Sequence, residues 1–195
     1  MKILILDNNS EYLEDLIKFL EKRRINYILH KPLNHISDKY DGVIASGGAI
    51  PRSRKKKILN WYRDFLNKNT KPFLGICLGH KILGYIYGAR IKFAPEKGVT
   101  KIFFTKSFPL TPTLRYLNVY QDHDFGLAIL PKNIVNYARS SRCSIQAIKV
   151  LNKPFFGVQF HPEIEGGIVL ENFLKYVGDI CGNDLNGKNF GERSE

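Results

Sequence analysis

The sequence predicts an α/β protein with an open, mostly parallel sheet flanked by helices and with antiparallel strands added in its C-terminal half. Two observations carry this prediction. Short apolar segments alternate with amphipathic helical segments up to residue 88, a pattern typical of parallel sheets covered by helices. Between residues 91 and 159, short strand-like segments follow one another instead. The length of 195 residues suits one domain.

In the first half, each expected strand is apolar and ends at a turn or at the start of a helix. We expect strands at residues 2–7, 27–29, 42–45 and 72–76. Ser10 or Asn9 can cap the first helix. One apolar face of this helix, with i, i+3, i+4 and i+7 spacing, consists of Leu13, Leu16, Ile17 and Leu20. The next helix is expected at residues 55–67, and the one after it starts after Cys77 and ends near Gly88.

The second half contains shorter strand patterns and one last helix. We expect strands at residues 100–105, 116–120, 134–138, 145–150 and 155–159, all as antiparallel additions to the sheet. The last amphipathic helix is expected at residues 167–177. Residues 1–181 then form the domain, and residues 182–195 form a polar C-terminal tail that we expect to be loose.

Composition excludes several classes of protein. An apolar fraction of 44% and a charged fraction of 25% argue against a wholly disordered or low-complexity chain. No segment is apolar enough for a membrane span or a secretory signal, so we expect a cytoplasmic protein without a membrane partner. Three cysteines without a pairing pattern predict neither a disulfide framework nor a metal site.

The chain carries a net charge of +12, and a basic run lies at residues 52–57. Because no nucleic-acid-binding motif accompanies this run, we do not expect nucleic acid as a partner. A solvated face is the first interpretation, and docking of an acidic protein partner is the second.

Cys77 has the setting of a nucleophile. It follows a buried strand, precedes a helix, and is flanked by Gly75 and Gly79, as in the G-x-S-x-G elbow with cysteine in place of serine. The helix N-terminus would stabilise its thiolate. A buried structural cysteine is the alternative interpretation, and the two glycines argue against it. Cys143, in a polar loop, and Cys181, in the tail, lack a comparable setting.

A general base for such a nucleophile is found just after the strand at residues 155–159. His161 is followed by Pro162 and Glu163. Proline favours an extended conformation in the residue before it, and residues i and i+2 of an extended chain point the same way. Glu163 can therefore orient the His161 ring and stabilise its charged form, as in a catalytic triad.

A possible oxyanion-binding loop follows the strand at residues 42–45. Ser46, Gly47, Gly48 and Ala49 lie where ligands bind in open α/β sheets, beyond the carboxyl ends of the strands. Two glycines can turn a backbone N–H toward a developing oxyanion. A plain turn is the alternative for this segment taken alone.

Together these motifs resemble the class I, triad-type glutamine amidotransferases over about residues 1–180. The resemblance implies that Cys77 attacks the side-chain amide of glutamine, that His161 moves the protons and that Glu163 orients His161. It also implies an oxyanion hole made by the backbone N–H groups of Gly48 and Leu78.

Within this family, the chain is most similar to the separate amidotransferase subunit of GMP synthases. The resemblance rests on three segments, at residues 46–49, 95–98 and 143–149. It implies glutamine as the substrate and a separate synthetase of the ATP-pyrophosphatase type as the partner. The chain contains no ATP-pyrophosphatase signature and no P-loop, so we expect no cofactor in this chain and ATP and Mg on the synthetase.

The chain departs from the family pattern around the substrate. Lys81 stands where the family has a glutamine, and residues 121–125 resemble the loop that grips the glutamine backbone, with acidic Asp122 and Asp124 and with Phe125 in place of an aspartate. The expected substrate-binding residues are Gly47, Gly48, Leu78, Lys81, Asp122, Asp124 and Phe125.

Two other functions stay open at this point. One is a non-catalytic or regulatory relative that keeps the triad, and the other is a γ-glutamyl hydrolase or peptidase on the same fold. Ammonia release from glutamine would exclude the first, and a preference for γ-glutamyl peptides over glutamine would indicate the second.

Overall fold

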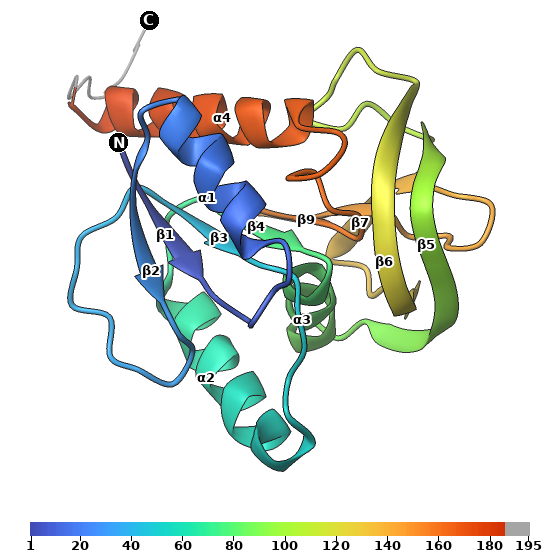
Figure 1. Ribbon diagram of the computed structural model, residues 1–195, viewed down its shortest axis with the longest axis horizontal. Coiled ribbons are helices and arrows are strands. Elements are labelled where there is room, and N and C mark those ends of the chain that lie inside the picture. The colour runs from blue at the N-terminus through green and yellow to red at the C-terminus, as the bar shows by residue number, and fades with distance from the viewer. Residues whose placement is uncertain (186–195) are drawn as a thin grey trace, which may run out of the picture.

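The computed structural model describes residues 1–185, which contain a nine-stranded sheet (Figure 1). Its strands are β1 Lys2–Leu6, β2 Asn26–His30, β3 Gly42–Ala45, β4 Phe73–Ile76, β5 Arg90–Phe104, β6 Tyr116–Ile129, β7 Ile134–Arg139, β8 Ala147–Val150 and β9 Phe155–Val158. The strand order is β2-β1-β3-β4-β9-β8-β7-β5-β6. The first five strands in this order, β2, β1, β3, β4 and β9, pair in parallel. The remaining pairs are antiparallel. The predicted fold class is confirmed.

Within residues 1–185, four α-helices and one short 3₁₀ helix accompany the sheet. They are α1 Leu13–Lys22, the 3₁₀ helix Arg52–Arg54, α2 Lys55–Lys68, α3 Leu78–Ile86 and α4 Ile168–Leu185. Alternate residues of each strand face opposite sides. Ile3 and Ile5 of β1 therefore pack in the core cluster with α1 and α4, whereas Leu4 and Leu6 pack in the cluster with α2 and α3. Figure 1 shows the same two layers.

Strands β5 and β6 are much longer than the predicted strands at 100–105 and 116–120. They form an antiparallel ribbon that pairs with β7 only through Phe103 and Phe104. Proline is unusual inside a strand, but the register shift between Phe93 and Glu96 accommodates Pro95, which has no N–H to donate. In Figure 1 this ribbon stands at one side of the molecule, beyond α3.

Two smaller expectations also need correction. β9 pairs in parallel with β4 and antiparallel only with β8, so it belongs to the parallel core as well as to the added strands. Helix α4 continues to Leu185, beyond the expected end at residue 177 and into the expected tail. Residues 186–195 of that tail lie outside the described residues.

No helix within residues 1–185 has the length and apolar character needed to cross a bilayer.

Candidate active site

Cys77 lies at a sharp turn between β4 and α3, as the sequence predicts. Its backbone has φ 47° and ψ −93°, a conformation that non-glycine residues rarely adopt. Its N–H donates to the carbonyl of Val158 at 2.8 Å, which ties the turn to β9. A Cβ on Gly75 would come within 2.5 Å of the Gly79 backbone, and one on Gly79 within 2.4 Å of the Ala45 carbonyl. The turn therefore requires both glycines.

His161 and Glu163 form a buried pair beside this turn. Nδ1 of His161 lies 2.7 Å from Oε1 of Glu163, and the two side chains are 3% and 2% exposed. The backbone N–H of His161 donates to the carbonyl of Tyr120 at 2.8 Å, which fixes this segment against β6. Burial lowers the pKa of His161, but its interactions with Cys77 and Glu163 outweigh burial and raise this pKa to about 10.

Hydrogen bonds from Asn8 fix the loop that follows β3. Asn8 donates its backbone N–H to Ser46 Oγ at 2.9 Å and its amide to the Ser46 carbonyl at 2.8 Å, and the Tyr62 hydroxyl donates to Asn8 Oδ1 at 2.8 Å. Gly48 has φ 117°, and a Cβ there would lie 2.3 Å from the Asn8 carbonyl. A Cβ on Gly47 would lie 2.6 Å from Cε1 of His161. The fold thus brings this loop against His161.

A cavity of about 670 Å³ opens over Cys77. Seven of the ten predicted catalytic, oxyanion-hole and substrate-binding residues line it: Gly48, Cys77, Lys81, Asp122, Asp124, Phe125 and His161. The other three are in contact with or next to lining residues: Gly47 beside His161, Glu163 bonded to His161, and Leu78 next to Cys77 at the start of α3. As the first residue of a helix, Leu78 has a backbone N–H without a partner inside the helix.

The acidic segment at residues 121–125 is not a loop, because it lies within β6. Successive residues of a strand point to opposite sides. Gln121 and His123 are buried, whereas Asp122 and Asp124 are more accessible and line the cavity. His123 Nε2 lies 3.2 Å from Gln121 Oε1 and 3.6 Å from Oε2 of the buried Glu96. One face of the strand therefore packs on a polar core, and the other presents carboxylates.

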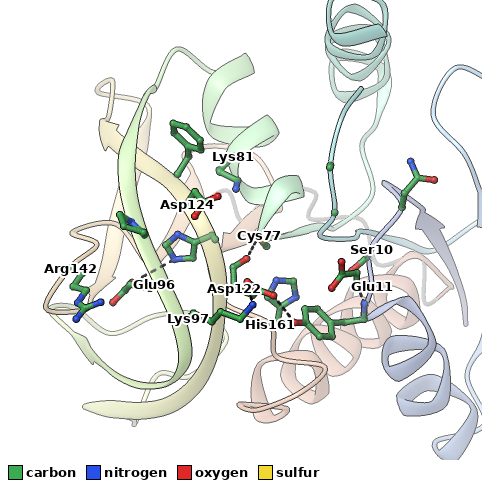
Figure 2. A pocket seen from close by; sticks show the side chains of 17 residues that line it. Ser10, Glu11, Cys77, Lys81, Glu96, Lys97, Asp122, Asp124, Arg142 and His161 are labelled. Atoms are coloured by element: carbon green, nitrogen blue, oxygen red, sulfur yellow. Dashed lines mark hydrogen bonds and ion pairs between the residues drawn. The ribbon is translucent and has the colours of Figure 1, made fainter. Parts of the chain in front are cut away.

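Three residues near Cys77 and His161 were missed at the sequence level. Gln159 donates its side-chain amide to Cys77 Sγ across 3.8 Å, and it is fully buried. Tyr12 and Lys97, from distant parts of the chain, both contact Asp122. Figure 2 shows Lys97 beside Asp122. Gln159 lies two residues before His161, and this closeness in sequence was the one signal that could have identified it.

His80 lies one helical turn after Cys77 and is fully buried. Burial, followed by the charge of Lys81, lowers the pKa of His80 to about 3. A Cβ on Gly157 would come within 2.8 Å of the His80 ring. His80 is therefore a neutral packing residue that joins α3 to β9.

The other two cysteines lie outside the cavity lining. Cys143, expected in a polar loop, is completely buried, and burial raises its pKa. Its N–H donates to Ser140 Oγ at 2.9 Å, so the polar neighbours turn the chain while the sulfur packs inward. Among residues 1–185, no group of three or more His, Cys, Asp or Glu side chains could hold a metal ion. The basic run at residues 52–57 is exposed.

Comparison with known proteins agrees with this geometry. The family model described as glutamine amidotransferase class-I matches residues 4–175. A glutamine-hydrolysing GMP synthase subunit from Methanocaldococcus jannaschii is 31% identical over 188 residues, which cover 90% of this chain and 97% of that protein. The protein of the same name from Pyrococcus abyssi is 30% identical over 91% of this chain and 100% of its own length.

Solved structures show the same fold. A protein from Thermoplasma acidophilum, provisionally assigned as a GMP synthase subunit, superimposes with a TM-score of 0.85 at 25% identity, covering 94% of this chain and 97% of its own. A glutamine amidotransferase from Thermotoga maritima gives a TM-score of 0.70 at 20% identity, covering 94% of this chain and 85% of its own.

Proposed function

The chain belongs to the class-I glutamine amidotransferase family, and we propose that it is the glutamine-hydrolysing subunit of a GMP synthase whose synthetase is a separate polypeptide. The observation that carries the proposal is Cys77 at a strained turn beside the buried His161–Glu163 pair, in a chain that covers its relatives from GMP synthases almost end to end.

In the first half of the reaction, Cys77 Sγ attacks the side-chain carbonyl carbon of glutamine as a thiolate, with its proton held on His161. Glu163 occupies Nδ1 of His161, which leaves Nε2 for the thiol and the leaving group. When the tetrahedral intermediate collapses, His161 gives this proton to the amide nitrogen. The C–N bond breaks, ammonia departs and a γ-glutamyl thioester remains on Cys77.

In the second half, water attacks the thioester carbon while His161 accepts one of its protons. The C–S bond breaks, glutamate leaves, and the sulfur returns as the thiolate paired with the protonated His161. The net change is glutamine plus water to glutamate plus ammonia. The raised pKa of His161 favours the protonated form in which it serves the leaving group.

The oxyanion of both tetrahedral intermediates would be bound by the backbone N–H groups of Gly48 and Leu78. Two features support this role. The φ of 117° and the close approach to Asn8 make glycine necessary at position 48. Leu78 opens α3, so its N–H and the positive end of the helix are available to a negative charge.

The substrate pocket would be completed by Gly47, Lys81, Asp122, Asp124 and Phe125, which lie in or next to the cavity over Cys77. Carboxylates at Asp122 and Asp124 suit the α-ammonium of glutamine. Lys81 supplies a positive charge in the same cavity.

Ammonia would pass to a separate synthetase of the ATP-pyrophosphatase type, which would also bind ATP and Mg. The names of the relatives support a multisubunit GMP synthase. The family and these relatives do not favour a non-catalytic protein or a γ-glutamyl peptidase.

The test is to supply amide-¹⁵N-labelled glutamine to the protein together with the polypeptide that co-purifies with it. The proposal predicts glutamate and ammonia in equal amounts, and ¹⁵N in the GMP formed when ATP and acceptor are present. A protein that releases no glutamate from glutamine, alone or with its partner, would contradict it.

A further inference from the structure

Three side chains from three elements meet across the cavity. Tyr12, just before α1, donates its hydroxyl to Oδ2 of Asp122 on β6 at 2.7 Å. The other carboxylate oxygen of Asp122, Oδ1, lies 3.7 Å from Nζ of Lys97 on β5. All three residues line the cavity, and Figure 2 shows Asp122 between Lys97 and His161, near Cys77.

Tyr12 also contacts the base. The centroids of the Tyr12 and His161 rings lie 4.6 Å apart, at an interplanar angle of 65°, and the Tyr120 ring packs edge-on against Tyr12 at 5.7 Å. Burial, followed by the hydrogen bond to Asp122, raises the pKa of Tyr12, so its hydroxyl remains a donor. One residue therefore orients both Asp122 and His161.

The two partners of Asp122 differ in strength. Lys97 is 78% exposed and lies at 3.7 Å, so solvent screens this ion pair and its contribution is small. The Tyr12 hydroxyl is a short, direct donor to a charged acceptor. A second ammonium that enters the cavity can therefore replace Lys97 while Tyr12 keeps the carboxylate in place.

The position of Asp122 suits the α-ammonium of glutamine. Cys77 Sγ donates to the Asp122 backbone carbonyl across 3.7 Å, so Asp122 lies directly beside the sulfur. The α-carbon of glutamine is separated from its amide carbon by two methylene groups. An amide held at Cys77 thus places the ammonium within reach of Asp122.

We propose, on the basis of the function proposed above, that Tyr12 is a positioning residue that holds the Asp122 carboxylate where it receives the α-ammonium of glutamine, and that Lys97 occupies this carboxylate until substrate displaces it. Tyr12 and Lys97 then act on substrate affinity with opposite signs. Loss of the Tyr12 hydroxyl weakens glutamine binding, whereas loss of the Lys97 ammonium removes a competitor.

The test compares Tyr12→Phe and Lys97→Met with two controls on the β5–β6 ribbon. Tyr116→Phe and Lys101→Met alter an exposed tyrosine and an exposed lysine that contact one another outside the cavity.

Tyr12→Phe should raise the KM for glutamine roughly five- to twenty-fold with kcat nearly unchanged, since one hydrogen bond to a charged group is lost and the ring remains. Lys97→Met should lower KM about two- to three-fold. Tyr12→Leu, which also removes the ring from His161, should lower kcat as well.

A binding measurement separates positioning from a general structural effect. In a Cys77→Ser background, which prevents turnover, calorimetry compares glutamine with glutaramate, the analogue without the α-amino group. Tyr12→Phe should weaken the binding of glutamine and leave that of glutaramate unchanged. Unchanged glutamine affinity, or equal losses for both ligands, would overturn the inference. A wild-type chain that neither hydrolyses nor binds glutamine would instead overturn the proposed function, and the inference with it.

Discussion

Nδ1 of His161 and Oε1 of Glu163 lie 2.7 Å apart, between side chains that are almost wholly buried. Burial alone would favour the neutral imidazole, yet the interactions of His161 with Cys77 and Glu163 raise its pKa from 6.5 to about 10. The pair therefore couples the protonation of the base to the stability of the fold.

This coupling predicts a dependence of stability on pH. Because the folded pKa of His161 lies above the unfolded value, the stabilising contribution is complete below pH 6.5 and is lost as the pH rises toward 10. Glu163→Gln should lower the free energy of unfolding by about 1–3 kcal/mol at pH 6, and this difference should shrink as the pH approaches 10. Urea unfolding at several pH values measures it. A difference that stays constant with pH would contradict the assignment.

Gly47→Ala tests how closely the loop after β3 approaches the triad. The added Cβ would lie 2.6 Å from His161 Cε1 and 3.5 Å from Cys77 Cβ, so the base must shift. We expect a loss of about 10²-fold in kcat, with the fold retained. Gly178→Ala is the matched control, because nothing lies within 4 Å of its Cβ, and it should keep full activity. Equal kcat values for the two variants would show that the approach is not critical.

Gln159→Met tests the donor that faces Cys77 Sγ at 3.8 Å. Methionine fills a similar volume without an N–H, so the thiolate loses one donor, and alkylation of Cys77 by iodoacetamide at neutral pH should slow by about three- to ten-fold. Peptide mass spectrometry follows each cysteine separately, and Cys143 and Cys181 serve as internal references. An unchanged rate at Cys77 would exclude Gln159 from stabilising the thiolate.

Lys81→Gln tests the charge balance of the pocket. Lys81 lines the cavity. In the proposed pocket its positive charge would lie near the ammonium of glutamine, whereas a glutamine side chain would offer an acceptor at the same position. The KM for glutamine should fall several-fold. This is the effect expected when the repulsion between two positive charges is removed at a partly exposed site. Steady-state kinetics with and without the partner measures it. Lys132→Gln, at an exposed site outside the cavity lining, is the control. A higher KM would show that Lys81 binds the substrate.

Local sequence predicts the parts of the site that local geometry creates. A cysteine between two glycines at a strand–helix junction indicates a sharp turn, and a histidine two residues before a glutamate indicates a pair. The expected extended segment at this pair is wrong, because residues 161–165 form a turn in which the N–H groups of Ile164 and Glu165 donate to the His161 carbonyl at 3.1 Å. The Tyr12–Asp122 bond joins residues separated by 110 positions, and no pattern in either segment indicates it. The β5–β6 ribbon is longer than predicted because the pairing between its two strands extends it, and local sequence does not indicate this pairing.

In the proposed reaction, Cys77 carries a γ-glutamyl thioester during turnover. The most direct test is to quench the protein in acid while it hydrolyses glutamine, with its partner present, and to determine by mass spectrometry which cysteine is acylated. We predict a γ-glutamyl group on Cys77 in the wild-type protein, its absence from Cys143 and Cys181, and no glutamate release by Cys77→Ala. Glutamine hydrolysis by Cys77→Ala at the wild-type rate, or an acyl group on another cysteine, would contradict this mechanism.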